Sequence, residues 1–173
     1  MEEKIKPYQL KLKEYILLYL DAKKDLFVQW KIDDFNTFDY VVQLITSGKL
    51  IRGSLVLLHT DITNISDDSF KAAAALELFH TGLLIHDDIM DNDEMRRGIQ
   101  SAHSFFRQHS KENNIKASSH IGQSLAICLG DILFFMGYEL FSKIKNEEAS
   151  QIVTTVSQEM TSVGFAQKWD IFW

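Results

Sequence analysis

Apolar residues recur every three or four positions along most of this chain, which is the spacing of amphipathic α-helices. Few residues interrupt that pattern, because the chain contains one proline and eight glycines. Segments this poor in helix breakers favour helices over strands and turns. The pattern predicts an all-α protein, with helices over residues 4–22, 35–46, 49–60, 69–91, 101–109, 119–144 and 147–163. A further helix is expected to open at Gly164, before the closing WDIFW segment.

The composition fits one globular domain over residues 1–173. Hydrophobic residues make up 46% of the chain and charged residues 24%, an ordinary globular balance. A chain of 173 residues is long enough to bury one sizeable core. The sequence shows no internal repeat, low-complexity tract or domain linker.

Charge and apolar runs exclude several classes of protein. The formal net charge of −6 argues against a nucleic-acid partner, since phosphate backbones attract basic surfaces. Cys128 is the only cysteine, so an intrachain disulfide is excluded. The two most apolar stretches, 70–85 and 124–138, carry charged residues and fall short of the roughly 18 apolar residues of a spanning helix. With no signal-peptide pattern at the start, we expect a cytoplasmic protein without a transmembrane segment.

The segment HDDIMDNDEMRRG, from His86 to Gly98, carries the most informative chemistry. On a helix, Asp87 and Asp91 share a face, and Asp88 lies within about 100° of both. Three carboxylates are therefore expected to converge on one patch. Mg²⁺ prefers such oxygen ligands, especially when substrate phosphates complete its coordination shell.

The same aspartates could instead form an ordinary solvated helix end. That alternative fits poorly, because carboxylates at a helix C-terminus meet the negative end of the helix dipole, at a cost of about 0.3–1 kcal/mol each. The three carboxylates also repel one another. An EF-hand is excluded, because no frame places acidic residues at loop positions 1, 3 and 5 with glycine at position 6.

Arg96 and Arg97 add positive charge to the same segment. In an unbroken helix Arg96 would point away from the aspartates, so we expect the chain to turn between them, near Asn92-Asp93 and Gly98. Carboxylates that hold metal ions beside guanidinium groups suit a diphosphate. The metals bridge its oxygens, and the arginines bind its remaining charge bidentately.

DDxxD at 87–91 followed by RRG at 96–98 resembles the first aspartate-rich motif of the trans-isoprenyl diphosphate synthases, the family of farnesyl and geranylgeranyl diphosphate synthases. The resemblance covers nearly the whole chain and corresponds to the amino-terminal half of that family. It implies an antiparallel helical bundle of the isoprenoid synthase type, truncated. The other matching segments are GKLIR at 48–52, ELFHT at 77–81, Gly122, Ala126-Ile127, Gly130-Asp131 and QKWD at 167–170.

The resemblance implies a Mg²⁺-dependent prenyltransferase that condenses isopentenyl diphosphate with an allylic diphosphate into an all-trans polyprenyl diphosphate. By this resemblance Asp87 and Asp91 coordinate Mg²⁺, with Asp88 in support. Arg96 would contact the allylic diphosphate, and Arg97 the diphosphate of isopentenyl diphosphate. The reaction implied is ionisation, condensation and elimination, in which the departing diphosphate is stabilised electrostatically.

Four further residues are expected to complete the isopentenyl diphosphate site: Gly48, Lys49, Arg52 and His80. Lys49 and Arg52 are three residues apart, so on a helix they would project from one side, at a helix start that also favours anions. Without the resemblance, that pair would be an ordinary solvated face and His80 a satisfied core histidine.

The resemblance also implies supporting roles for other residues, in catalysis, in structure and in setting product length. Gln167 and Asp170 are expected to support the reacting end of the allylic substrate, whereas Asp131 and His103 are expected to make structural hydrogen bonds. Product length is expected to depend on Gly82 and Leu83, where short-chain relatives often carry aromatic rings that block the growing tail. Gly82 is expected to leave that space open, which predicts a product of geranylgeranyl length or longer. Candidate floors of the tail site are Phe79, Phe134 and Phe135.

The chain also departs from the family. A second aspartate-rich motif, with a third Mg²⁺, and a Lys-Thr element have no match here, so we expect little or no turnover by these 173 residues alone. Ser47, Leu50 and Gly53 stand where the family usually has Gly, a basic residue and Pro. We expect a homodimer or a heteromer with a synthase subunit. Two alternatives stay open: a class I terpene cyclase, which needs no second diphosphate site, and a non-catalytic partner subunit of a complete synthase.

Overall fold

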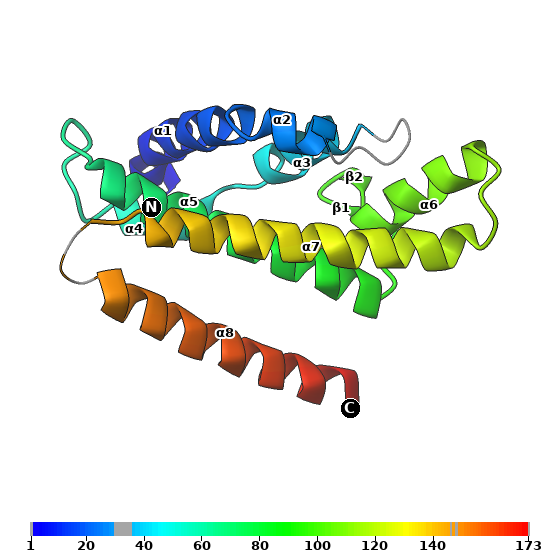
Figure 1. Ribbon diagram of the computed structural model, residues 1–173. Helices are drawn as coiled ribbons and strands as arrows, with labels where there is room; N and C mark the ends of the chain where they lie inside the picture. The colour runs from blue at the N-terminus through cyan, green and yellow to red at the C-terminus, as the bar shows by residue number, and fades with distance from the viewer. Residues whose placement is uncertain (1, 30–35, 146, 148, 173) are drawn as a thin grey trace.

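The computed structural model describes residues 2–29, 36–145, 147 and 149–172, and its regular structure is mostly helical (Figure 1). A small antiparallel hairpin, β1 (Met95–Arg96) and β2 (Ile99–Gln100), joins the fifth helix to the sixth. The all-α class is therefore confirmed. The helices are α1 (Glu2–Asp21), α2 (Lys24–Gln29), α3 (Thr37–Thr46), α4 (Ile51–Leu57), α5 (Asp67–Met90), α6 (Ala102–Glu112), α7 (Ser118–Ser142) and α8 (Ala149–Phe172).

Helices α5 and α7 lie antiparallel at the centre of the molecule and make its most extensive helix–helix contact. Glycines let their backbones approach closely. A Cβ atom added at Gly82 would lie 2.9 Å from the carbonyl oxygen of Gly130, and one added at Gly137 would lie 3.2 Å from that of Ala75. The apolar runs of the sequence thus become the paired centre of a helical bundle.

The remaining helices cover this central pair. Helices α1 and α4 pack against α5, and α6 packs along α7. Helix α1 buries one face, with Leu12, Ile16 and Leu20 in the common core, as its amphipathic pattern predicts. Helices α1 to α3 lie on one side of the pair and α8 on the other (Figure 1).

Local side-chain and backbone effects set the observed helix boundaries. Helix α5 begins two residues earlier than expected, because the Ser66 hydroxyl accepts a hydrogen bond from the Ser69 N–H at 3.0 Å and caps the first turn. Helix α4 begins at Ile51 rather than Lys49, because the buried Leu50 adopts a left-handed conformation with φ of 48°. Helix α2 was not predicted, and residue 35, the expected start of α3, lies outside the described residues.

Helix α8 is continuous over Ala149–Phe172, so the expected break at Gly164 is wrong. Glycine lowers helix propensity by about 1 kcal/mol relative to alanine, which weakens a helix without ending it. No described residue of α8 is fully buried. One side of its first half, including Ile152, Val156 and Met160, packs partly against the core.

Helix α7 is long and apolar enough to cross a membrane by length and composition, with 44% of its most apolar stretch buried inside the fold. A core helix of a folded domain meets the same criterion, so this is weak support for a membrane span. The place of α7 between α5 and α6 accounts for its apolar composition.

Candidate functional site

The three aspartates at the end of α5 occupy two different environments. Asp88 is 1% exposed, whereas the Asp87 side chain is 31% exposed and Asp91 lies at the surface as the helix C-cap. In the described part of the chain, no three His, Cys, Asp or Glu side chains form a group that could hold a metal ion. The expected convergence of three carboxylates is therefore wrong for Asp88, which points into the protein.

Arg96 bonds to both of the adjacent aspartates. Its Nε donates to Asp88 Oδ1 at 2.6 Å, and its Nη2 donates to Asp87 Oδ2 at 3.3 Å. Burial raises the pKa of Asp88, and the guanidinium of Arg96 opposes that rise. Asp88 therefore acts on the site through Arg96, which it holds beside Asp87.

The chain reverses between the aspartates and the arginines, as expected, and it does so through the β1–β2 hairpin. Arg97 and Gly98 form the two-residue loop, with φ of 54° and 82°. Both values are positive, as a type I′ hairpin turn requires. Glycine adopts this conformation freely, but arginine does so at a cost of about 1–2 kcal/mol. The residue held in this unfavourable conformation is one that was predicted to bind substrate.

Arg52 of α4 contacts His80 directly, and Arg96 and Arg97 of the hairpin act on His80 through their positive charge. Arg52 Nη1 lies 3.0 Å from His80 Nε2. The guanidinium of Arg97 packs against Gly48, where any Cβ atom would collide with it. The pKa of His80 is lowered to about 4, mainly because the side chain is buried. The positive charges of the three arginines lower this pKa further. The guanidinium of Arg52 supplies positive charge beside this imidazole, and the two side chains together offer hydrogen-bond donors to a phosphate or diphosphate.

Lys49 lies before α4, so the expected helical face shared by Lys49 and Arg52 is wrong. Its side chain is exposed, and its carbonyl oxygen accepts a hydrogen bond from Gln9 Nε2 at 2.6 Å. Lys49 lies in the loop just before the start of α4, and Arg52 lies in the first turn of that helix.

The start of α4 is occupied by a carboxylate of the protein itself. Glu77 of α5 is buried, and its Oε1 accepts a hydrogen bond from the Gly53 N–H at 2.7 Å. The N–H of Arg52 also bonds to this carboxylate. The expectation that these N–H groups attract a substrate anion is therefore wrong. Glu77, whose pKa is raised by burial, instead ties α4 to α5 and places Arg52 beside His80.

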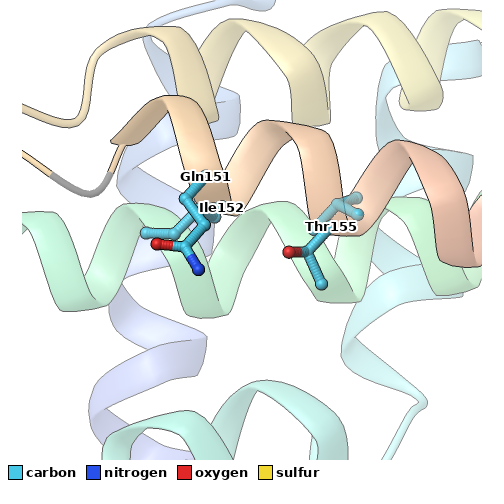
Figure 2. Close-up of a pocket in the computed structure, with 4 residues that line it drawn as sticks. Gln151, Ile152 and Thr155 are labelled. Atoms are coloured by element: carbon cyan, nitrogen blue, oxygen red, sulfur yellow. The ribbon is translucent and has the colours of Figure 1, made fainter.

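Helix α8 brings Gln167 to the aspartates. Its Nε2 donates to Asp87 Oδ1 at 3.0 Å, whereas Asp170 is exposed. Roughly 16–24 Å along the helix from Gln167, the first half of α8 borders an open cavity of about 380 Å³ (Figure 2). The residues that line this cavity are Gln151, Ile152, Thr155 and Val156.

Phe134 of α7 fills the space beside Gly82. A Cβ atom added at Gly82 would lie 2.7 Å from Cε1 of that ring, so the expectation that Gly82 leaves this space open is wrong. Phe79 is buried against the same ring, with centroids 6.0 Å apart. Leu83 is half-buried, and Phe135 points outward to the surface of α7.

His103 and Asp131 make contacts within the fold. His103 is buried, and its Nδ1 lies 3.3 Å from the Ser101 hydroxyl. Asp131 lies 3.6 Å from His86 Nε2, linking α7 to α5. The expected structural hydrogen bond is present at His103 Nδ1, whereas the 3.6 Å separation at Asp131 exceeds hydrogen-bond range, so that part of the expectation stays a prediction.

Sequence reasoning missed the residues that hold the hairpin in place. The Tyr40 hydroxyl donates to the Gln100 carbonyl at 2.9 Å, across 60 positions of sequence. Arg107 forms an ion pair with Glu94, 13 positions away. Neither separation corresponds to a helical or strand repeat, so no pattern in the sequence could have identified these partners.

Comparison with known proteins shows which protein family this chain resembles. A family model described as polyprenyl synthetase matches residues 36–173. The short chain isoprenyl diphosphate synthase of Methanocaldococcus jannaschii is 33% identical over 130 residues, 74% of this chain and 35% of that protein. The geranylgeranyl diphosphate synthase of Methanosarcina mazei is 35% identical over 101 residues, 58% of this chain and 26% of that protein. The chain thus spans between about a quarter and about a third of the length of these curated relatives.

A solved structure shares the fold. Geranylgeranyl pyrophosphate synthase from Corynebacterium glutamicum, complexed with isoprenyl diphosphate and magnesium, superposes with a TM-score of 0.63 at 23% sequence identity. The similarity covers 77% of this chain and 40% of that one. With the family match over 36–173 and the DDxxD and RRG segments on adjoining elements, the chain belongs to the polyprenyl synthetase family.

Proposed function

We propose that this chain binds the diphosphate groups of isopentenyl diphosphate and of an allylic diphosphate and takes part in their condensation to an all-trans polyprenyl diphosphate. One observation carries the proposal: neighbouring arginines of one hairpin face two different groups. Arg96 bonds to Asp87 and Asp88, while the guanidinium of Arg97 packs on Gly48. Two adjacent diphosphate sites are what the joining of two diphosphate substrates requires.

The donor set suits Mg²⁺. Mg²⁺ in phosphoryl sites commonly takes one or two carboxylates and completes its shell with substrate oxygens and water. Asp87 and Asp91 are carboxylates four residues apart that both reach the surface, so they would hold the metal. Bound Mg²⁺ would offset the negative charge of the departing diphosphate. Arg96 stands beside Asp87 to bind the remaining charge.

The other residues would bind and orient the second substrate. Arg52 and Arg97 supply charge-assisted hydrogen bonds to its diphosphate, and neutral His80 adds a further polar contact. Gln167, bonded to Asp87, brings α8 over the reacting end. The walls formed by the helices would exclude water from the allylic cation.

The tail of the allylic substrate would extend along α5, away from the aspartates. A product of geranylgeranyl length or longer stays a prediction. Phe134 occupies the space beside Gly82, and we therefore assign the local limit on tail length to Phe134. In an assembly with measurable turnover, Phe134→Ala should lengthen the main product by chromatography. Phe79→Ala, a change in the buried layer behind it, should lengthen the product less.

The chain alone is expected to show little or no prenyl transfer. We propose that it acts as a homodimer or with a synthase subunit, and a cytoplasmic location stays a prediction. Membership of the polyprenyl synthetase family and the cluster around His80 argue against a terpene cyclase, which needs no second diphosphate site. A pull-down with a full-length synthase, combined with a prenyl transfer assay, separates a catalytic role from that of a non-catalytic partner.

The proposal is tested by calorimetric titration of the 173-residue chain with inorganic pyrophosphate, with and without Mg²⁺. We expect Mg²⁺-dependent binding that Asp87→Ala or Asp91→Ala weakens at least about tenfold, equivalent to about 1.4 kcal/mol. Asp61→Ala is the matched control, because Asp61 is an exposed aspartate that bonds to Thr63 in a remote turn. Absence of binding, or equal binding by all variants, would overturn the proposed function.

A further inference from the structure

The β1–β2 hairpin is too short to hold its own position. Its two strands contain two residues each, paired as Met95 with Gln100 and Arg96 with Ile99. An isolated two-stranded hairpin is marginally stable at best. The left-handed conformation of Arg97 in its loop adds a further cost. Contacts with other elements must therefore keep the hairpin in place.

The first contact comes from α3. Tyr40 is 5% exposed, and its hydroxyl donates to the carbonyl oxygen of Gln100, the last residue of β2, at 2.9 Å. The Tyr40 ring stacks on Phe105 of α6, with centroids 4.3 Å apart and planes 12° apart. The hydroxyl is thus aimed by a ring that is itself held between α3 and α6.

The second contact comes from α6. The guanidinium of Arg107 pairs with Glu94, the residue before β1. The carbonyl oxygen of Glu94 accepts the Ser101 N–H at 3.0 Å, which closes the base of the hairpin. The backbone of Arg107 is fixed in turn by α7, because a Cβ atom added at Gly122 would lie only 2.9 Å from its nitrogen.

We propose that Tyr40 and Arg107 are positioning residues of the diphosphate site, which hold the β1–β2 hairpin so that Arg96 faces the aspartates and Arg97 faces Gly48. This inference rests on the proposed function. Neither residue needs to touch a substrate. Tyr40 holds the end of the hairpin and Arg107 its beginning, so the loss of either loosens the backbone that carries both arginines, even though Arg96 keeps its bonds to Asp87 and Asp88.

Two variants test the inference in the 173-residue chain. Tyr40→Phe removes one hydroxyl and keeps the stacked ring, and Arg107→Gln removes the charge. Tyr8→Phe is the matched control, because the Tyr8 hydroxyl donates to the Thr60 carbonyl at the same 2.9 Å, far from the hairpin. Arg107→Lys keeps the charge and serves as the rescue variant. Amide hydrogen exchange of residues 95–101 and calorimetric titration with pyrophosphate plus Mg²⁺ are the two measurements.

We expect Tyr40→Phe and Arg107→Gln each to speed the amide hydrogen exchange of the hairpin. Each should also weaken pyrophosphate binding by about fivefold, which is the effect of one net hydrogen bond. Tyr8→Phe should change neither quantity, even if it lowers the melting temperature. Arg107→Lys should recover part of both losses.

Unchanged amide hydrogen exchange of the hairpin in both variants would overturn the inference. Faster exchange with unchanged pyrophosphate binding would also overturn it, because that result is expected of a merely structural role. If the unaltered chain does not bind pyrophosphate, the proposed function fails first and the inference falls with it. If the unaltered chain binds and the two variants bind equally well, only the inference fails.

Discussion

Arg97 combines an unfavourable backbone conformation with a side chain in the proposed site. Its φ of 54° suits asparagine or glycine better than arginine, because both tolerate the left-handed region. Strain of this kind persists where the surrounding structure holds it in place, and it is common at functional sites. The side chain, packed on Gly48, gives a physical reason for arginine at this position.

Replacing Arg97 should therefore separate stability from binding. We expect Arg97→Asn to leave the free energy of unfolding unchanged or to raise it by up to about 1 kcal/mol, while weakening pyrophosphate binding measured without Mg²⁺, at the site assigned to isopentenyl diphosphate, about tenfold. Thermal denaturation and calorimetry measure the two effects. Ala117→Gly, at φ of 58° before α7, is the control that relieves similar strain without a change in binding. A destabilised Arg97→Asn with normal affinity would contradict this account.

His80 should make stability depend on pH. Its pKa is lowered from 6.5 to about 4 in the folded chain, so between these values the unfolded chain binds more protons. The free energy of unfolding should therefore fall as the pH decreases from about 6.5 to about 4. Urea denaturation at pH 7 and pH 5 measures the fall.

The comparison with His80→Asn isolates this group. The pKa of Glu77 is raised, which acts in the opposite direction, so the raw slope of stability against pH is a sum of effects. We expect the variant to lose less stability than the unaltered chain between pH 7 and pH 5. An equal loss in both would show that the pKa of His80 is not lowered.

At the scale of elements, the close approach of α5 and α7 depends on the missing side chain of Gly82, whereas Gly164 of α8 has no such close contact. A Cβ atom at Gly82 would meet the Phe134 ring at 2.7 Å and the Gly130 carbonyl oxygen at 2.9 Å, whereas one at Gly164 would meet nothing within 4 Å. Both glycines lie inside helices. The same substitution should therefore have opposite effects at the two positions.

We expect Gly82→Ala to lower the free energy of unfolding by about 1–3 kcal/mol, because a backbone carbonyl cannot move aside as a side chain can. Gly164→Ala should raise it by up to about 1 kcal/mol, through helix propensity alone. Urea denaturation of both variants provides the measurement. If Gly82→Ala also stabilised the chain, the close approach of α5 and α7 would be wrong.

At the scale of the whole molecule, large apolar side chains remain on the surface of α7 and α8. Exposed apolar side chains of this size are candidates for a contact with another polypeptide where they adjoin one another. The exposed residues are Ile127, Ile132, Phe135, Val163, Phe165, Trp169, Ile171 and Phe172. The predicted homodimer or heteromer would cover part of this surface.

If copies of the chain associate through α7, Phe135→Asp should raise the dissociation constant at least about tenfold in sedimentation velocity runs. Leu18→Asp is a matched control, because Leu18 of α1 is 72% exposed, the same fraction as Phe135. An equal effect of the two substitutions would point to nonspecific association. A monomer at all concentrations would contradict the homodimer.

The sequence alone determined the helical class and the order of the long helices, and it also predicted which segments bind diphosphate. These features depend on local periodicity and on residues close together in the chain, such as Asp87, Asp91 and Arg96. The single domain over 1–173 stays a prediction. Local pattern could not show that Asp88 is buried or that Glu77 occupies the start of α4, because burial and long-range hydrogen bonds arise only when helices pack.

Tertiary structure also decided which side chains surround each position. Because glycine has no side chain, the sequence predicted open space beside Gly82. The ring of Phe134, 52 positions later in the chain, fills that space. Tyr40 and Arg107 show no motif, yet they contact both ends of the hairpin that carries the two arginines. The physical reason is common to these cases: sequence periodicity specifies which face of a helix is apolar, while the partner of that face depends on how the whole chain packs.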